Sequence, residues 1–154
     1  MKKILSIVLC LATILCACGL FAHAAAPERE RTVTVFPDGS YCITTITVEA
    51  SEAVATMASM KTKTGVKSQE FYSATNALLY TAYVRGTFQY DGNTSIATAA
   101  QYSYKITDST WSFVSGSATH TNATAIAVCK FHATIAGDRT ATVRLSCAPD
   151  GTLS

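Results

Sequence analysis

Residues 78–106, LLYTAYVRGTFQYDGNTSIATAAQYSYKI, form two runs of alternating apolar and polar residues around the turn sequence Asp91-Gly92. Strict alternation over such lengths is typical of strands with one buried face, and Asp-Gly between two such runs is a strong hairpin signal. The stretch therefore predicts a long β-hairpin. The apolar face of the first run comprises Leu78, Tyr80, Ala82, Val84, Gly86, Phe88 and Tyr90, and that of the second comprises Ile96, Ala100, Tyr102, Tyr104 and Ile106.

The rest of the chain predicts more strands of the same kind. It is rich in Thr, Ser, Ala, Val and Tyr, and turn sequences such as Pro37-Asp38-Gly39 and Pro149-Asp150-Gly151 separate the runs. We expect a single all-β domain, an antiparallel β-sandwich with an immunoglobulin-like arrangement as one form of it and a small β-barrel as the alternative. The expected further strands are 31–36, 41–48, 68–73, 111–119, 123–135 and 140–147.

One segment does not fit this pattern. Glu49 to Met60 is rich in Ala, Ser, Thr and Met and is the weak candidate for a helix, with a loop as the alternative.

The N-terminal segment predicts export. Lys2 and Lys3 precede an apolar stretch, and the small residues that follow include Ala22-His23-Ala24, which is the pattern of a bacterial secretory signal peptide. We expect residues 1–24 to be the signal peptide, residues 25–154 to be the secreted, extracellular domain, and the mature chain to begin at Ala25 or Ala26. Two alternatives are a lipid anchor at Cys18 and retention of the segment as a membrane anchor.

Removal of the signal peptide changes the charge balance. All ten acidic residues remain, together with ten of the twelve basic residues, so the mature chain is about neutral. Nucleic-acid binding requires a basic surface that this balance does not provide. The expected partner is a cell-surface polymer or a protein, with no nucleic acid and no stable membrane span after cleavage.

Three of the six cysteines, Cys42, Cys129 and Cys147, lie in the predicted mature domain. If strands 123–135 and 140–147 pair around a loop at residues 137–139, Cys129 faces Cys147, and facing residues can be close enough for a disulfide. Cys42 would then be a buried, unpaired thiol. The alternative is that all three are buried and reduced.

Known catalytic and ligand-binding motifs are absent from the sequence. It has no GxSxG, HExxH, P-loop, GxGxxG or EF-hand pattern. His120 and His132 are the histidines of the mature domain, and their spacing predicts no metal site. We therefore expect no enzyme activity, catalytic residue, metal or cofactor, and we expect the turn aspartates to have structural roles.

Two groups are candidates for surface contacts. Lys61, Lys63 and Lys67 form the one basic cluster, which fits an anionic polymer or, more simply, a solvated edge strand or loop. Among the aromatic residues, Tyr72, Tyr83 and Trp111 are the candidates for ligand stacking. Tyr80, Tyr90, Tyr102 and Tyr104 are expected to pack in the core because of their positions in the alternation.

Several short motifs run through the chain, namely residues 38–41, 43–46, 61–65, 84–92 and 109–111 and the C-terminal residues 145–147 and 151–154. They resemble those of an uncharacterised family of small secreted proteins from gram-positive anaerobic bacteria. The family has no assigned activity, so the resemblance implies no functional residues. Its members often have a cysteine near position 97, where this chain has Ala97.

These observations favour a secreted, non-enzymatic β-module that binds an extracellular partner. A secreted antimicrobial, bacteriocin-like protein is the alternative, based on analogy at the level of fold. A small hydrolase is the third hypothesis.

Overall fold

The computed structural model describes residues 29–53 and 60–154. The predicted signal peptide, the mature start at Ala25 or Ala26, and Cys18 lie outside these ranges. The described chain is all-β, and its eight strands are β1 (Arg29–Val35), β2 (Tyr41–Ala53), β3 (Lys61–Tyr72), β4 (Leu78–Tyr90), β5 (Ser95–Ile106), β6 (Trp111–Thr121), β7 (Thr124–Ala133) and β8 (Gly137–Ser146).

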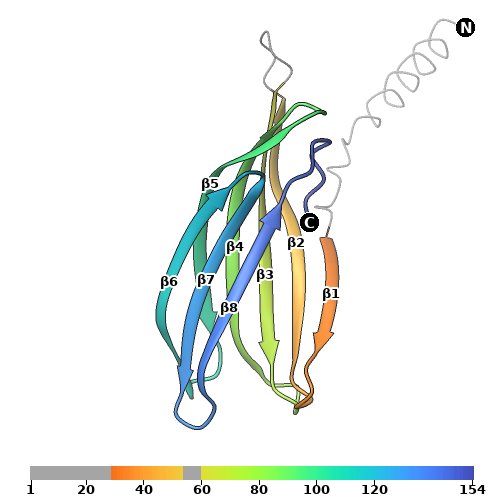
Figure 1. Ribbon diagram of the computed structural model, residues 1–154. Coiled ribbons are helices and arrows are strands. Elements are labelled where there is room, and N and C mark those ends of the chain that lie inside the picture. Colours follow the sequence, from red (N-terminus) through yellow and green to blue (C-terminus); the bar gives the residue numbers. More distant parts are fainter. Residues whose placement is uncertain (1–28, 54–59) are drawn as a thin grey trace, which may run out of the picture.

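The strands form two antiparallel sheets that pack face to face, which confirms the β-sandwich (Figure 1). The large sheet has the order β1-β2-β3-β4-β5 and the small sheet has the order β6-β7-β8. Neighbouring strands in each sheet are consecutive in sequence, so the chain is a meander. This order differs from that of immunoglobulin domains, in which Greek-key connections place non-consecutive strands side by side. The described strands form two separate sheets rather than a closed barrel.

The predicted hairpin of residues 78–106 is confirmed as β4 and β5, with Tyr90 opposite Ser95. A β-bulge interrupts its register, because Thr87 faces Ala99 whereas Phe88 faces Ala97. The extra residue shifts the alternation at the start of β5. As a result Ala97 is buried and Ile96 is 50% exposed, the reverse of what the alternation predicts.

The core lies between the centre of the large sheet and the small sheet. The predicted inner face of β4 is correct, since Tyr80, Ala82, Val84, Phe88 and Tyr90 are all buried. The prediction for Tyr102 and Tyr104 is wrong, because these side chains are 39% and 43% exposed. They lie on the inner face, but β5 is the edge strand of its sheet, so their rings remain partly open to solvent.

The central part of the large sheet extends further than the sequence predicts. Residues 49–53 belong to β2, so the helix prediction is wrong for this part, and residues 54–59 lie outside the described residues. The basic cluster begins β3, which lies between β2 and β4. The interpretation of this cluster as an edge strand or loop is therefore wrong, and Lys63 and Lys67 are only partly exposed.

The predicted pairing of Cys129 with Cys147 is also wrong. Cys129 faces Ala141, and β7 and β8 join at Ala133 and Gly137 rather than at residues 136 and 140. Gly137, with a φ of 69°, follows the three-residue loop 134–136 in the left-handed conformation that this kind of hairpin requires. Cys147 lies six positions after Ala141, which is about 20 Å along a strand and far beyond disulfide reach.

All three described cysteines are buried and free, which fits the alternative that they are reduced thiols. Burial raises the pKa of the Cys42 and Cys129 thiols, which disfavours the reactive thiolate. We therefore expect a thiol reagent to label a native protein of residues 25–154 slowly and to label its three cysteines rapidly after denaturation. Mass spectrometry without reduction tests this result, and a mass lower by two hydrogens would contradict it.

Candidate functional site

The two long sides of the sandwich differ in how they close. On the β5–β6 side, the ring of Tyr104 stacks on that of Phe113 at 3.8 Å between centroids, and the ring of Tyr102 lies against Gly116. On the other side, β8 packs over β3 and β4, and no described strand of the small sheet packs comparably on β1 or β2. The inner face of β1 and β2 is therefore not covered by the small sheet, and Figure 1 shows these strands beyond β8.

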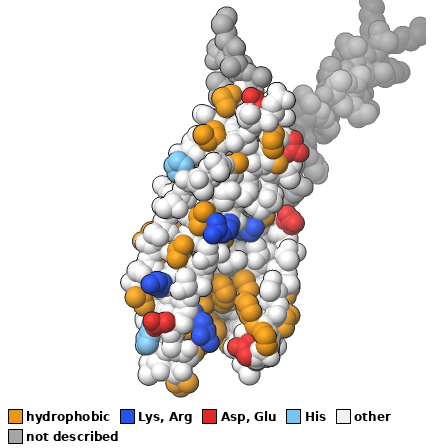
Figure 2. All heavy atoms as spheres, viewed as in Figure 1, with side chains coloured by type: hydrophobic (Ala, Val, Ile, Leu, Met, Phe, Trp, Pro, Cys, Tyr) orange, Lys and Arg blue, Asp and Glu red, His pale blue; other side chains and the backbone are white. Residues whose placement is uncertain are grey.

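An open groove follows this uncovered face. We use the term "groove" for the three hollows that lie along it between the turn end of the sandwich and the C-terminal residues. The hollow at the turn end measures about 270 Å³, and the two near the C-terminus measure about 210 and 160 Å³. Figure 2 shows hydrophobic side chains exposed in a depression of this face, in the lower half of the view.

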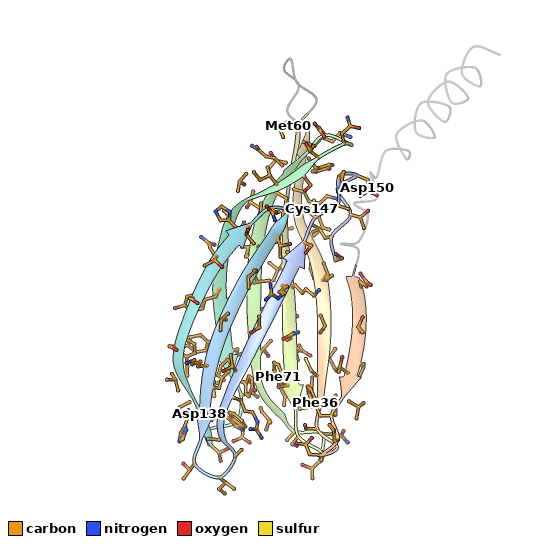
Figure 3. All side chains as sticks on the ribbon, in the orientation of Figure 1. Phe36, Met60, Phe71, Asp138, Cys147 and Asp150 are labelled. Carbon is orange, nitrogen blue, oxygen red and sulfur yellow. The ribbon has the colours of Figure 1, made fainter. Side chains whose placement is uncertain are left out.

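The hollow at the turn end is rich in aromatic residues. The ring of Tyr80 stacks on that of Phe71 and lies against that of Trp111, each at 4.8 Å between centroids. Figure 3 shows Phe36 and Phe71 at this end of the molecule, with Asp138 of the β7–β8 hairpin nearby. The remaining lining is contributed by Ser40, Tyr41, Tyr72, Leu79, Ala136, Arg139 and Thr140. We call this set, with Phe36, Phe71, Tyr80 and Trp111, the aromatic hollow.

Arg139 is the charged residue of the aromatic hollow. It lies near the start of β8, on the same face as the buried Ala141, and it is paired with Phe131 of β7. Hydrogen bonds from Ser40 are the main cause of the lowered pKa of Asp38, and the positive charge of Arg139 adds to this effect. The same charge opposes the rise in the pKa of Tyr80 that burial causes. Burial nevertheless raises the pKa of Tyr80 to about 12, so its hydroxyl stays protonated at neutral pH.

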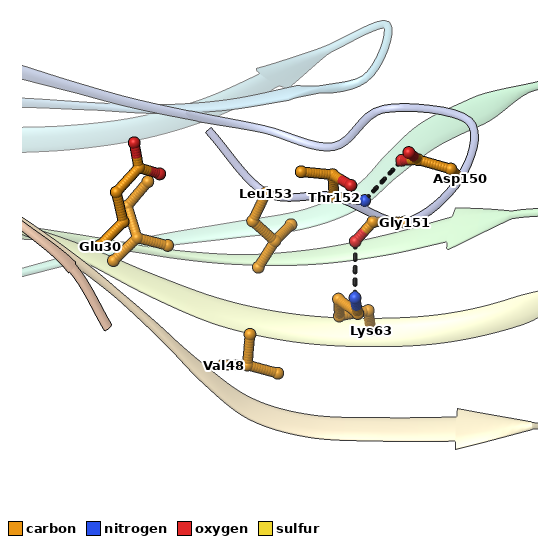
Figure 4. A pocket seen from close by; sticks show the side chains of 8 residues that line it. Glu30, Val48, Lys63, Asp150, Gly151, Thr152 and Leu153 are labelled. Atoms are coloured by element: carbon orange, nitrogen blue, oxygen red, sulfur yellow. Dashed lines mark hydrogen bonds between the residues drawn. The ribbon is translucent and has the colours of Figure 1, made fainter. Parts of the chain in front are cut away.

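The other end of the groove carries lysines. Lys63 donates a hydrogen bond of 2.6 Å to the carbonyl of Gly151 (Figure 4). Its ammonium also lies 5.6 Å from the ring centre of Tyr90. Lys67 lines the smallest hollow together with Glu30, Thr44 and Ser154. Its partial burial lowers the pKa of the Lys67 ammonium, while the charge of Glu30 opposes this effect.

The structure brings together four of the six predicted contact residues. Tyr72 and Trp111 line the aromatic hollow, and Lys63 and Lys67 line the lysine end. Trp111 is only 9% exposed, so it supports the hollow rather than presenting a free surface ring. Lys61 and Tyr83 line none of the three hollows. Tyr83 points to the opposite face of β4, because its neighbours Ala82 and Val84 face the core.

Sequence reasoning missed Arg139 and Phe71 as site residues. Arg139 follows a Gly-Asp turn sequence and looked like part of a loop, and the hydrophobic alternation gave Phe71 an ordinary strand position. Arg139 and Phe71 come from different sheets, so their positions in one hollow depend on how the two sheets pack. The sequence offered one signal for this site, because several aromatic residues occur at those ends of successive predicted strands that would lie together in a sheet.

The ionisable groups of the described residues do not assemble a metal site, since no cluster of three His, Cys, Asp or Glu side chains occurs there. The carboxylates of Asp38, Asp91, Asp108 and Asp150 accept hydrogen bonds within turns, which lowers their pKa. Asp138 instead pairs with the Nδ1 atom of His132 at 2.7 Å on the surface. These contacts give the aspartates structural roles, as we expected for most of them.

Comparison with protein-family models, with curated proteins and with solved structures gives no match for the chain. The resemblance to secreted proteins of gram-positive anaerobes therefore stays an expectation. The described chain contains no helix that is both long and apolar enough to cross a membrane.

Proposed function

We propose that this chain is an exported, non-enzymatic binding module whose extracellular ligand occupies the groove. The observation that carries the proposal is the aromatic hollow, to which both sheets contribute residues and in which Arg139 is the charged group. Binding sites are typically concave and mainly apolar, with a few polar groups that orient the ligand. The N-terminal sequence supports export.

The size of the aromatic hollow limits what enters it. Ligand pockets for drug-sized molecules have volumes of about 300–1,000 Å³, whereas a cavity of about 150 Å³ holds benzene. The aromatic hollow, at about 270 Å³, therefore fits one ring-sized group of a larger ligand. The rest of that ligand would lie along the groove.

The protein contains an internal reporter for this site, because Trp111 is its single tryptophan. We expect a ligand of the groove to change Trp111 fluorescence when mature protein is titrated with peptidoglycan fragments, teichoic acid, glycans and peptides. Arg139→Ala should weaken binding by about tenfold or more, since a hydrogen bond to a charged group contributes about 1.5–3 kcal/mol.

Lys130→Ala is the matched control, because Lys130 is an exposed cation of the neighbouring strand β7 that lines none of the hollows. Its affinity should equal that of the wild type. Equal affinity of the wild type and Arg139→Ala for every ligand found would place binding elsewhere and contradict the proposal.

A further inference from the structure

The outer edge of β8 has a defined pattern of free backbone groups. Ser146 exchanges two backbone hydrogen bonds with Ser154, of 2.9 and 3.0 Å, on the side away from β7. In an antiparallel strand, alternate residues direct both their N–H and C=O groups to the same neighbour. Thr140, Thr142 and Arg144 therefore direct theirs to this outer edge. None of the three has a backbone partner there within the described residues.

The C-terminal residues already use one end of this edge. After β8 the chain turns back, with a hydrogen bond from Ala148 to Thr152 and a bridge between Cys147 and Leu153. Leu153 is buried and lies directly over Gly65 of β3. An extended segment therefore fits between the edge of β8 and the large sheet. We call the continuation of this path beyond Ser154, along the edge of β8 to Thr140, the open lane.

We propose that an extended peptide segment of a partner protein adds to the edge of β8 in the open lane, as a fourth strand of the small sheet. This inference rests on the proposed function, because it names the ligand of the same groove. Addition of a strand satisfies the free edge groups, and alternate side chains of the peptide supply specificity. The peptide would run antiparallel to β8, in the direction of the chain's own last residues.

The lining of the groove specifies the side chains of the peptide. Ser154 lies at the hollow that contains Lys67, and Thr140 lies at the aromatic hollow. The lane between them spans about six residues, or about 20 Å. Peptide residues opposite Leu145, Val143 and Ala141 would face the large sheet, because those β8 residues face inward.

The first of these inward residues would lie near Lys67, which shares its hollow with Glu30 but forms no ion pair with it within 4 Å. An acidic side chain complements this charge. The third inward residue, four positions later, would reach the aromatic hollow, so an aromatic side chain fits there. The expected partner segment is therefore a strand with an acidic residue and an aromatic residue four positions apart.

A tethered probe tests the inference. The sequence Glu-Thr-Val-Thr-Phe-Thr is added after Ser154 of the mature chain, so that its first residue is placed opposite Leu145. A short tether gives a millimolar effective concentration. We expect amide hydrogen exchange of Thr140, Thr142 and Arg144 to slow by roughly fivefold or more, and Trp111 fluorescence to change.

Two matched controls separate strand addition from side-chain contact. The first replaces the second and fourth residues of the extension with proline, which removes two of the three amides that would donate to β8. The second compares Thr142→Pro with Thr142→Val in the extended chain. The amide of residue 142 points away from β7, so proline there removes a hydrogen bond to the extension and leaves those between β7 and β8 in place. Both proline changes should abolish the protection, and Thr142→Val should retain it.

Unchanged exchange in the extended chain, or equal protection by the proline extension, would overturn the inference. Protection that increases with concentration in the unextended chain would do so too, because it would identify a second copy as the occupant. If a glycan or another ligand changes Trp111 fluorescence while the extension leaves the β8 amides unprotected, the proposed function stands and the peptide inference fails.

Discussion

Phe131→Ala is expected to lower the free energy of unfolding by about 3–5 kcal/mol, the usual cost of removing a fully buried phenylalanine. The side chain of Phe131 has no exposed surface, and its ring centre lies 4.0 Å from that of Tyr80 in the opposite sheet. It also meets the edge of Phe113 at 5.9 Å. The loss would be a large part of a typical total stability of about 5–15 kcal/mol. Urea unfolding followed by circular dichroism measures it.

Phe36→Ala is the control for this prediction, because Phe36 is 39% exposed and lies in the aromatic hollow rather than between the sheets. Its loss should cost less than about 1 kcal/mol. If Phe131→Ala does not fold, Phe131→Leu provides a smaller change at the same position and should still cost more than Phe36→Ala. Equal costs at the two positions would contradict the assignment of Phe131 to the core.

Local signals made the fold class predictable from the sequence. The alternation in β4 and the turn at Asp91-Gly92 act over neighbouring residues, and both lead to the hairpin that the structure contains. The same signals failed where one residue changes the register. The bulge opposite Thr87 moves Ile96 to the outer face, and the actual turn before Gly137 moves Cys129 away from Cys147. Period-two patterns do not specify bulges or turn positions.

The groove was less predictable, because it results from the unequal number of strands in the two sheets. Whether β3 is an edge strand or an interior strand depends on which strands pair, and this pairing decided the role of Lys63 and Lys67. Tyr72 and Trp111 were selected as separate surface residues, but they lie in one hollow. Their meeting depends on contacts between segments that are distant in sequence, which local patterns do not encode.

Gly86 is the site of the second large expected effect, because the sheets pack very closely there. A Cβ atom at Gly86 would lie 2.7 Å from ring atoms of Phe88 and 2.9 Å from the Cβ atom of Ala125 in β7. Both neighbouring side chains have no exposed surface, so neither has room to move away. The glycine is therefore required by the approach of β7 to β4 rather than by its own backbone conformation.

Gly86→Ala should consequently lower the free energy of unfolding by about 1–3 kcal/mol, the usual cost of overpacking a core. The additional substitution Ala125→Gly removes one of the two clashes and should restore part of the loss, so a double-mutant cycle in urea would show favourable coupling.

Gly116→Ala is the matched control. Its added Cβ atom would clash with the ring of Tyr102, but that ring is 39% exposed and can move toward solvent. We expect it to cost less than about 1 kcal/mol. A larger loss for Gly116→Ala than for Gly86→Ala would show that the aromatic contacts at the β5–β6 side, and not the β4–β7 contact, are the more rigid junction between the sheets.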